Sequence, residues 1–235
     1  MSAHYEHLRA DRVLQTLDKL QARIDARFPS AGLSSVCADL IQTAKFCARD
    51  AADLARPSYF WRLVSLLLIL GGIAAQIAAF RFLHIEGGEL SAPDFVQGLE
   101  AAVNLLILFG GAVWFVLTLE ERSKRRRALD ALHRLRSLAH VIDMHQLTKD
   151  PTIVLDSQKT AASPERTMTQ FELTRYLDYC AEMLALIGKL AALYADKMRD
   201  NVVINAVNDI ENLTAGLGRK IWQKITIIGA LEEHR

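Results

Sequence analysis

Cysteine is scarce in this chain, and its placement excludes two common structural roles. The three cysteines, Cys37, Cys47 and Cys180, form an odd number and include no CxxC pair. That pattern supplies neither a disulfide framework nor a zinc motif. We expect all three to be small buried side chains that remain reduced thiols in cytoplasmic segments.

Motifs that carry catalysis are missing as well. The sequence contains no GxxxxGK loop, no GxGxxG after a strand, no HExxH and no nucleophile elbow. His133 and His140 lie seven residues apart on one helix face, but nothing supplies the closely spaced ligands that a metal needs. Solvated or hydrogen-bonded helix polar groups are the preferred interpretation. We expect no enzyme activity, no cofactor and no metal site.

No N-terminal signal peptide is expected, because the first residues are polar and the first long apolar run begins near residue 60.

The chain does have two long apolar stretches, Leu63–Leu83 and Ala101–Leu119, which bracket an acidic loop. A helix rises about 1.5 Å per residue, so each stretch covers roughly 30 Å, enough to cross a bilayer core. The alternative is a pair of buried helices in a soluble core.

The flanking charges favour the membrane interpretation and predict an orientation. Basic residues precede the first stretch and follow the second, whereas the connection between them is mainly acidic. The basic flanks are Lys45, Arg49, Arg56 and Arg62, then Arg122 and Lys124 to Arg127; the connection holds Glu86, Glu89, Asp94 and Glu100 against Arg81 and His84. Basic segments stay in the cytoplasm, so we expect both termini there, residues 84–98 outside, and Trp61 and Trp114 near the inner interface.

Apolar residues recur at helical spacing on both sides of the apolar stretches. An amphipathic helix is predicted over 5–28, ended by Pro29 and Gly32, and a second from about Ser35, with Ser34 or Ser35 as its N-cap. The expected core positions of these helices are Leu14, Leu17, Leu20, Ile24 and Phe28, then Val36, Leu40, Ala44, Cys47, Ala51 and Leu54.

The second span is predicted to continue as a stalk, because neither Gly nor Pro occurs between Gly111 and Pro151. Two further helices are expected after it. The first is capped by Ser163 before Pro164 or by the box Thr169-x-x-Glu172, and the last follows a turn at Asp200-Asn201. Core positions expected in these segments include Leu129, Leu132, Leu135, Leu138, Val141, Ile142, Leu177, Cys180, Leu184, Tyr194, Val207, Ile210, Leu217, Ile221 and Ile225.

The predicted architecture is an all-α membrane protein: a two-helix transmembrane hairpin joined to a helical cytoplasmic domain formed by both chain ends. Its expected parts are N-terminal cytoplasmic helices in 1–57, the transmembrane hairpin in 58–120, a stalk helix in 121–151 and a C-terminal helical hairpin in 152–235, with spans near 63–83 and 101–119.

Small and polar residues inside the spans are candidates for helix packing or a pore. Glycine pairs at Gly71-Gly72 and Gly110-Gly111 are expected to meet at a similar depth and to permit a tight hairpin, a subunit contact or a hinge. Ser65, Gln76 and Asn104 either hydrogen-bond between helices or line water. Two helices cannot enclose a pore, so conduction would require several hairpins around an axis.

The basic run after the second span has three interpretations. Arg125 and Arg126, with Arg134 and Arg136 further along, fix topology, contact anionic lipid headgroups, or bind a phosphate-bearing ligand such as a nucleotide or oligonucleotide. Aromatic residues are not interleaved with these charges, which disfavours a nucleic-acid platform.

Residues 35–148 combine a cytoplasmic helix, a hairpin with a short outer loop and a long helix that leaves the second span. The segments RRALDALHRLRSLAHVIDMHQLTKDP (Arg126–Pro151), YLDYCAEMLALIGKLAALY and RKIWQKI resemble bacterial membrane proteins. The layout of 35–148 resembles the SLATT-type two-span effectors of bacterial conflict systems, and this resemblance has implications for function. It implies an oligomeric pore of the bacterial inner membrane in antiviral defence, gated by a nucleotide signal from a partner enzyme. No individual functional residue follows from it. The alternative is a non-conducting, membrane-anchored scaffold or signalling partner.

Overall fold

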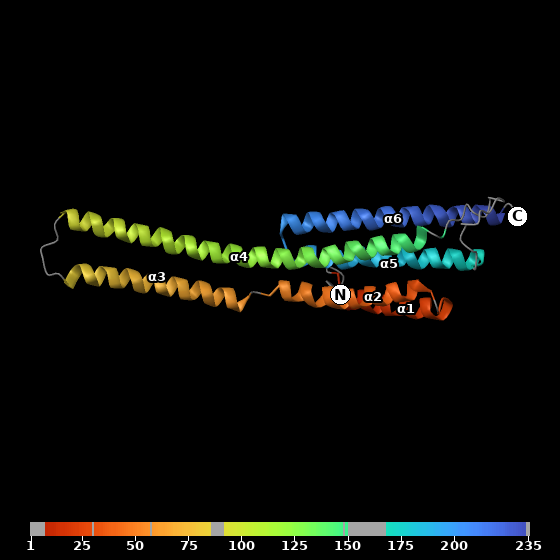
Figure 1. The fold of residues 1–235 in the computed structure, drawn as a ribbon, viewed down its shortest axis with the longest axis horizontal. Coiled ribbons are helices and arrows are strands. Elements are labelled where there is room, and N and C mark those ends of the chain that lie inside the picture. The colour runs from red at the N-terminus through yellow and green to blue at the C-terminus, as the bar shows by residue number, and fades with distance from the viewer. Residues whose placement is uncertain are drawn as a thin grey trace, which may run out of the picture. The chain divides into compact units, whose positions relative to one another are not determined.

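The computed structural model describes residues 8–29, 31–56, 58–85, 92–147, 149 and 168–233. All regular secondary structure in these ranges is α-helical, which confirms the expected all-α class (Figure 1). The helices are α1 (Ala10–Arg27), α2 (Gly32–Leu54), α3 (Tyr59–Ile85), α4 (Ala92–Leu147), α5 (Gln170–Lys197) and α6 (Asn201–Glu233).

The chain divides into two compact units. One is the hairpin unit, Arg56–Arg126; the other is the helical domain, formed by Met1–Ala55 together with Arg127–Arg235. The helical domain therefore combines both ends of the chain. Helix α4 contributes residues to both units, and it is a single helix of 56 residues. The predicted continuity of the second apolar stretch with the stalk is thus confirmed.

In the hairpin unit, α3 and the first part of α4 lie side by side (Figure 1). The carboxamide of Gln76 donates to the backbone oxygen of Ala102 at 3.3 Å and links the two helices. Helix α3 ends at Ile85 and α4 begins at Ala92, so helix extends into the expected loop 84–98 from both sides. Pro93 does not prevent this early start, because the backbone N–H that proline lacks has no partner in a first helical turn.

The core of the helical domain is made of apolar stripes at alternating spacings of three and four residues. Helix α5 packs against α6, α1 and α2. The domain part of α4 adds Ala128, Leu132, Leu135, Ala139 and Ile142, all buried. Burial of each large aliphatic side chain contributes about 1.5–3 kcal/mol.

Most of the predicted stripe residues are buried; Leu14, Leu129, Leu138 and Ile225 are half-buried, and one residue is exposed. The fully buried ones include Leu17, Leu20, Ile24, Leu40, Leu177, Leu184, Tyr194 and Ile221. Val141 was expected in the stalk stripe, but it is 42% exposed. The buried seam of α4 passes through Ala139 and Ile142, and Val141 lies about 100° around the helix from Ile142.

Polar caps begin the last two helices as the sequence predicts. Thr169 is the N-cap of α5: its hydroxyl accepts from Glu172 N at 3.2 Å, and the Glu172 carboxylate accepts from Thr169 N at 2.7 Å. Of the two caps considered for this helix, the structure confirms the Thr169 box. Asp200 Oδ1 accepts from the backbone of Val202 and Val203, which confirms the turn into α6.

The start of the second helix was predicted wrongly. Helix α2 begins at Gly32 after Ala31, which has no capping side chain, so neither Ser34 nor Ser35 is its N-cap. The Ser34 hydroxyl instead donates to Asp25 Oδ1 at 2.6 Å and ties the end of α1 to the start of α2. That bond, with one from Gln21, lowers the pKa of Asp25. Helix α1 covers Ala10–Arg27 of the predicted 5–28.

Several other expectations lie outside the described residues. They include the end of the stalk helix at residue 151 and the alternative cap of Ser163 before Pro164.

Candidate functional site

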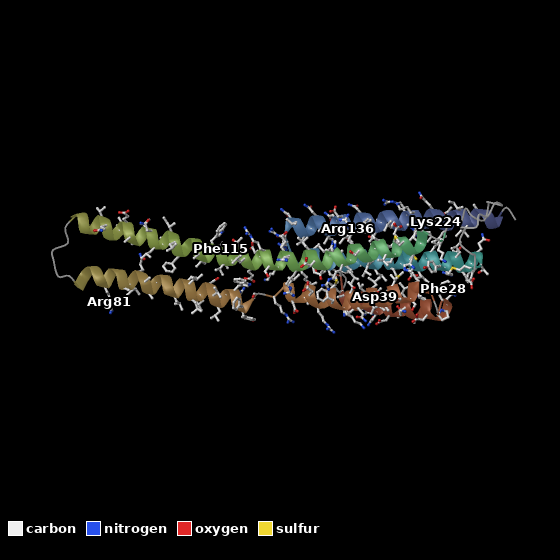
Figure 2. The ribbon with its side chains drawn as sticks, viewed as in Figure 1. Phe28, Asp39, Arg81, Phe115, Arg136 and Lys224 are labelled. Atoms are coloured by element: carbon white, nitrogen blue, oxygen red, sulfur yellow. The ribbon has the colours of Figure 1, made fainter. Side chains whose placement is uncertain are left out.

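Helices α3 and α4 present long apolar surfaces that nothing in the described chain covers. Both are long and apolar enough to cross a membrane, and only 6% of the apolar window in each is buried. The exposed large side chains include Leu63, Leu66, Leu67, Leu70, Ile73, Ile77, Leu106, Ile107, Leu108, Trp114 and Phe115, the last labelled in Figure 2. A buried helix pair of a soluble core would cover such residues, so the hairpin unit is the first candidate site.

The inner face of the hairpin unit is built around Gly72. A Cβ placed on Gly72 would lie 2.9 Å from Cγ of Phe109, so the missing side chain makes room for this ring. The glycine pairs do not meet, contrary to expectation: Gly71, Gly110 and Gly111 each have open space where a Cβ would stand. An apolar hollow of about 500 Å³ lies between the two helices, lined by Gly72, Phe109, Gly110 and neighbouring aliphatic side chains.

The three polar residues of the spans occupy different positions. Gln76 is half-buried and bonded to Ala102 across the helix pair. Ser65 is buried, and its hydroxyl has no hydrogen-bond partner. Asn104 is exposed. Only Gln76 therefore makes the interhelical bond expected of such residues, and Asn104 remains available to a group outside the chain.

A small polar cluster closes the hairpin unit at the start of α3. Glu120 accepts from the backbone N–H of Ser58 at 3.1 Å, next to the first residue of α3. Lys124 lies 2.8 Å from Glu120 and donates to the backbone oxygen of Arg56 at 3.1 Å. A carboxylate near a helix N-terminus is favoured by unpaired N–H groups and by the helix dipole. The cluster thus fixes the chain entering α3 against α4.

The four arginines predicted as an anion site all lie on α4. Within the hairpin unit Arg125 is half-buried and Arg126 exposed. Within the helical domain Arg134 stacks over the Phe46 ring at 5.0 Å, and Arg136 is exposed (Figure 2). Arg134 and Arg136 are two residues apart, about 200° around the helix, so they do not converge on one ligand.

A second group of arginines was not found from the sequence. Arg23, Arg27 and Arg175 line an open hollow of about 540 Å³ beside Tyr179. Arg23 pairs with Glu182, while Arg175 Nη1 lies 3.2 Å from Asp178. These carboxylates offset much of the positive charge. The four-residue spacing places Arg23 and Arg27 on one face of α1, but only the packing of α1 on α5 brings Arg175 beside them.

A buried polar cluster connects α2, α4 and α5 inside the helical domain. Asp50 is 5% exposed; its Oδ1 accepts from Arg127 at 2.6 Å and its Oδ2 from the Tyr194 hydroxyl at 3.3 Å. Burial raises the pKa of Tyr194, so the phenol remains a donor. Burial also raises the pKa of nearby Cys47 to about 11. The cluster holds the three helices together.

The remaining candidates carry no site in the described chain. The cysteines are free and buried, as expected, and burial raises the pKa of Cys37 and Cys180 to about 12. His133 and His140 are exposed, and no group of three or more metal-ligand side chains occurs among the described residues.

Comparison of the chain with protein-family models, with curated proteins and with solved structures finds no match. The candidate site therefore rests on the geometry of the hairpin unit and its flanking charges.

Proposed function

We propose that this chain is a two-span integral membrane protein whose hairpin units assemble into a channel, with the helical domain controlling the gate from the cytoplasm. The observation that carries the membrane part is the exposure of apolar side chains on α3 and α4, with 6% of each apolar window buried. Each large aliphatic side chain is worth about 1.5–3 kcal/mol on leaving water, so the surface favours hydrocarbon strongly.

The orientation follows from charge. The helical domain and both basic flanks lie on the cytoplasmic side of a bacterial inner membrane, because Lys and Arg near span ends are retained there. Exposed Tyr59 and Phe60 at the start of α3, and Trp114 near the end of the second span, match the aromatic belt of the inner interface.

Conduction requires several hairpin units, and the surface of α4 supports their assembly. Two helices enclose no water-filled path, so a conducting form needs several copies around an axis. Asn104 is exposed and the Gly111 position is open, so α4 offers a polar carboxamide and a place of close approach to another helix. Control through the domain is supported by the continuity of α4, whose single helix belongs to both units.

A ligand could shift the gate only by binding the open and closed states with different affinity. The exposed basic residues Arg126 and Arg136 are the proposed contacts for an anionic lipid headgroup or a nucleotide made by a partner enzyme. We also propose a role in bacterial antiviral defence, in which that nucleotide is the signal.

One observation favours the second candidate, a non-conducting anchored scaffold: the spans lack a broad polar face, and most of their exposed side chains are apolar. In that case the hairpin holds the helical domain at the membrane and conducts nothing.

Two measurements test these proposals. Leu90→Cys, within the expected outer loop, should react with a membrane-impermeant maleimide from outside intact cells; reaction only from the cytoplasmic side refutes the topology. Purified protein in liposomes should release a trapped ion, and a chain without residues 164–235 should do so at a different rate. If both chains leave liposomes sealed with every nucleotide tried, the scaffold is the better description.

A further inference from the structure

A stripe of polar and small residues runs along the first part of α4 at seven-residue intervals. It consists of Gln97, Asn104, Gly111 and Thr118. Seven residues are almost two helical turns, so these positions lie nearly above one another. The stripe is polar or small at every step, whereas the exposed residues beside it include Ile107, Leu108, Trp114 and Phe115.

The stripe lies on the side of α4 that faces away from α3. The side toward α3 is marked by Ala102, whose oxygen accepts from Gln76, and by Phe109, whose ring fills the space at Gly72. Asn104 follows Ala102 by two residues, and Gly111 follows Phe109 by two. Two residues are about 200° around a helix, so the stripe is turned almost directly away from the partner helix.

Such a stripe is unfavourable against lipid and favourable against another helix. A carboxamide in hydrocarbon loses its water without gaining a partner. Nothing lies within 4 Å of a Cβ built on Gly111, so another backbone can approach there. The Thr118 hydroxyl already donates to the Trp114 oxygen at 2.8 Å, and Gln97 precedes the expected span 101–119, so Asn104 is the stripe residue that most needs a partner.

We propose that this stripe is the contact with a second copy of the same chain, and that the α4 helices meet along it in parallel around the symmetry axis of the oligomer. A carboxamide both donates and accepts, so Asn104 is complementary to Asn104 of another copy. Copies inserted with one orientation hold this residue at one depth, and a heptad repeat keeps parallel helices in contact over several turns. The proposal rests on the membrane insertion proposed above and identifies the surface around which the channel forms.

Disulfide cross-linking along α4 tests the contact. Gly111→Cys and Thr118→Cys, which keep Asn104, are compared with Leu106→Cys and Leu117→Cys, whose parent side chains are 72% and 46% exposed on another side of α4. Full-length protein in native membranes is oxidised with copper phenanthroline, and the wild-type chain with its buried cysteines is the background. Dimers should form at 111 and 118. Equal or stronger dimers at 106 and 117 would overturn the proposal.

A second comparison isolates the carboxamide. Asn104→Leu should reduce the cross-linked fraction at position 118 about tenfold, the equivalent of one interhelical hydrogen bond. Asn104→Gln should keep most of it, and Leu106→Asn added to Thr118→Cys should not increase it. An Asn104→Leu, Thr118→Cys chain that cross-links as strongly as Thr118→Cys alone would refute the role of Asn104. Strong cross-linking in vesicles that stay sealed would refute the channel while leaving the contact intact.

Discussion

Nη2 of Arg127 lies 2.6 Å from Oδ1 of Asp50, a carboxylate that is almost fully withdrawn from water. The Tyr194 hydroxyl approaches the other oxygen of the same carboxylate at 3.3 Å. One side chain of α2 thus joins α4 and α5. A buried carboxylate is stabilising only while its partners remain, because a partner left alone in the interior keeps its desolvation cost.

Asp50→Ala should lower the free energy of unfolding of the helical domain by about 1–3 kcal/mol, since the Tyr194 hydroxyl loses its acceptor. Asp39→Ala is the matched control: it removes an exposed carboxylate from the same helix (Figure 2) and should change stability by less than about 0.5 kcal/mol. Denaturant titration in mild detergent, followed by far-UV circular dichroism, measures both. Equal midpoints would show that the Asp50 cluster contributes nothing.

Ile221→Ala should cost about 2–5 kcal/mol, because Ile221 is fully buried and truncation leaves a cavity that the packed helices fill only partly. The neighbouring change Lys220→Ala removes an exposed side chain and should have little effect. The same titration compares the two variants. A stable Ile221→Ala protein would remove the α6 stripe from the core.

The capping box of α5 should make stability depend on acidity. Hydrogen bonds from the Thr169 backbone and hydroxyl lower the pKa of Glu172 in the folded chain. A lowered folded pKa gives a contribution that is present above the unfolded value, about 4.3, and is lost as the pH falls through the folded value. Glu172→Gln keeps the shape of the box without this titration. The melting temperature of wild type should therefore fall more steeply with acid than that of the variant, and parallel profiles would contradict the assignment.

Thiol reactivity should report unfolding of the helical domain. Burial raises the pKa of Cys37, Cys47 and Cys180 to about 11–12, so each is a neutral, inaccessible thiol near pH 7.4. Native protein should take up no maleimide within minutes, whereas denatured protein should take up three equivalents. Mass spectrometry counts the adducts. Rapid labelling of native Cys180 would mean that the α5–α6 packing opens readily.

Local chemistry accounts for the parts of the fold that the sequence predicts well. A threonine followed three residues later by glutamate marks the start of α5, and Asp200 marks the start of α6, because a cap needs only neighbouring backbone N–H groups. Apolar stripes likewise identify the buried face of a helix, but they do not identify the helix that packs against it.

Contacts between different helices were missed because local spacing does not indicate which side chains meet when helices pack. Nothing near Ser34 in the sequence indicates that its hydroxyl bonds to Asp25 rather than capping α2. The glycine pairs suggested contact with each other, but the rotation of the two helices places Phe109 against Gly72. The pairing of Asp50 with Arg127 depends on which helix packs on which, and helical periodicity leaves that open.

The C-terminal end of α4 has a further consequence for truncation experiments. Lys224 Nζ donates to the backbone oxygen of Gln146 at 3.0 Å and to its side-chain oxygen at 2.7 Å. The ammonium group of this α6 residue therefore binds the last turn of α4. Carbonyl groups in that turn have no intrahelical donor. Deleting α6 would therefore fray α4 as well as remove a partner, whereas Lys224→Met would release the end of α4 and leave α6 in place.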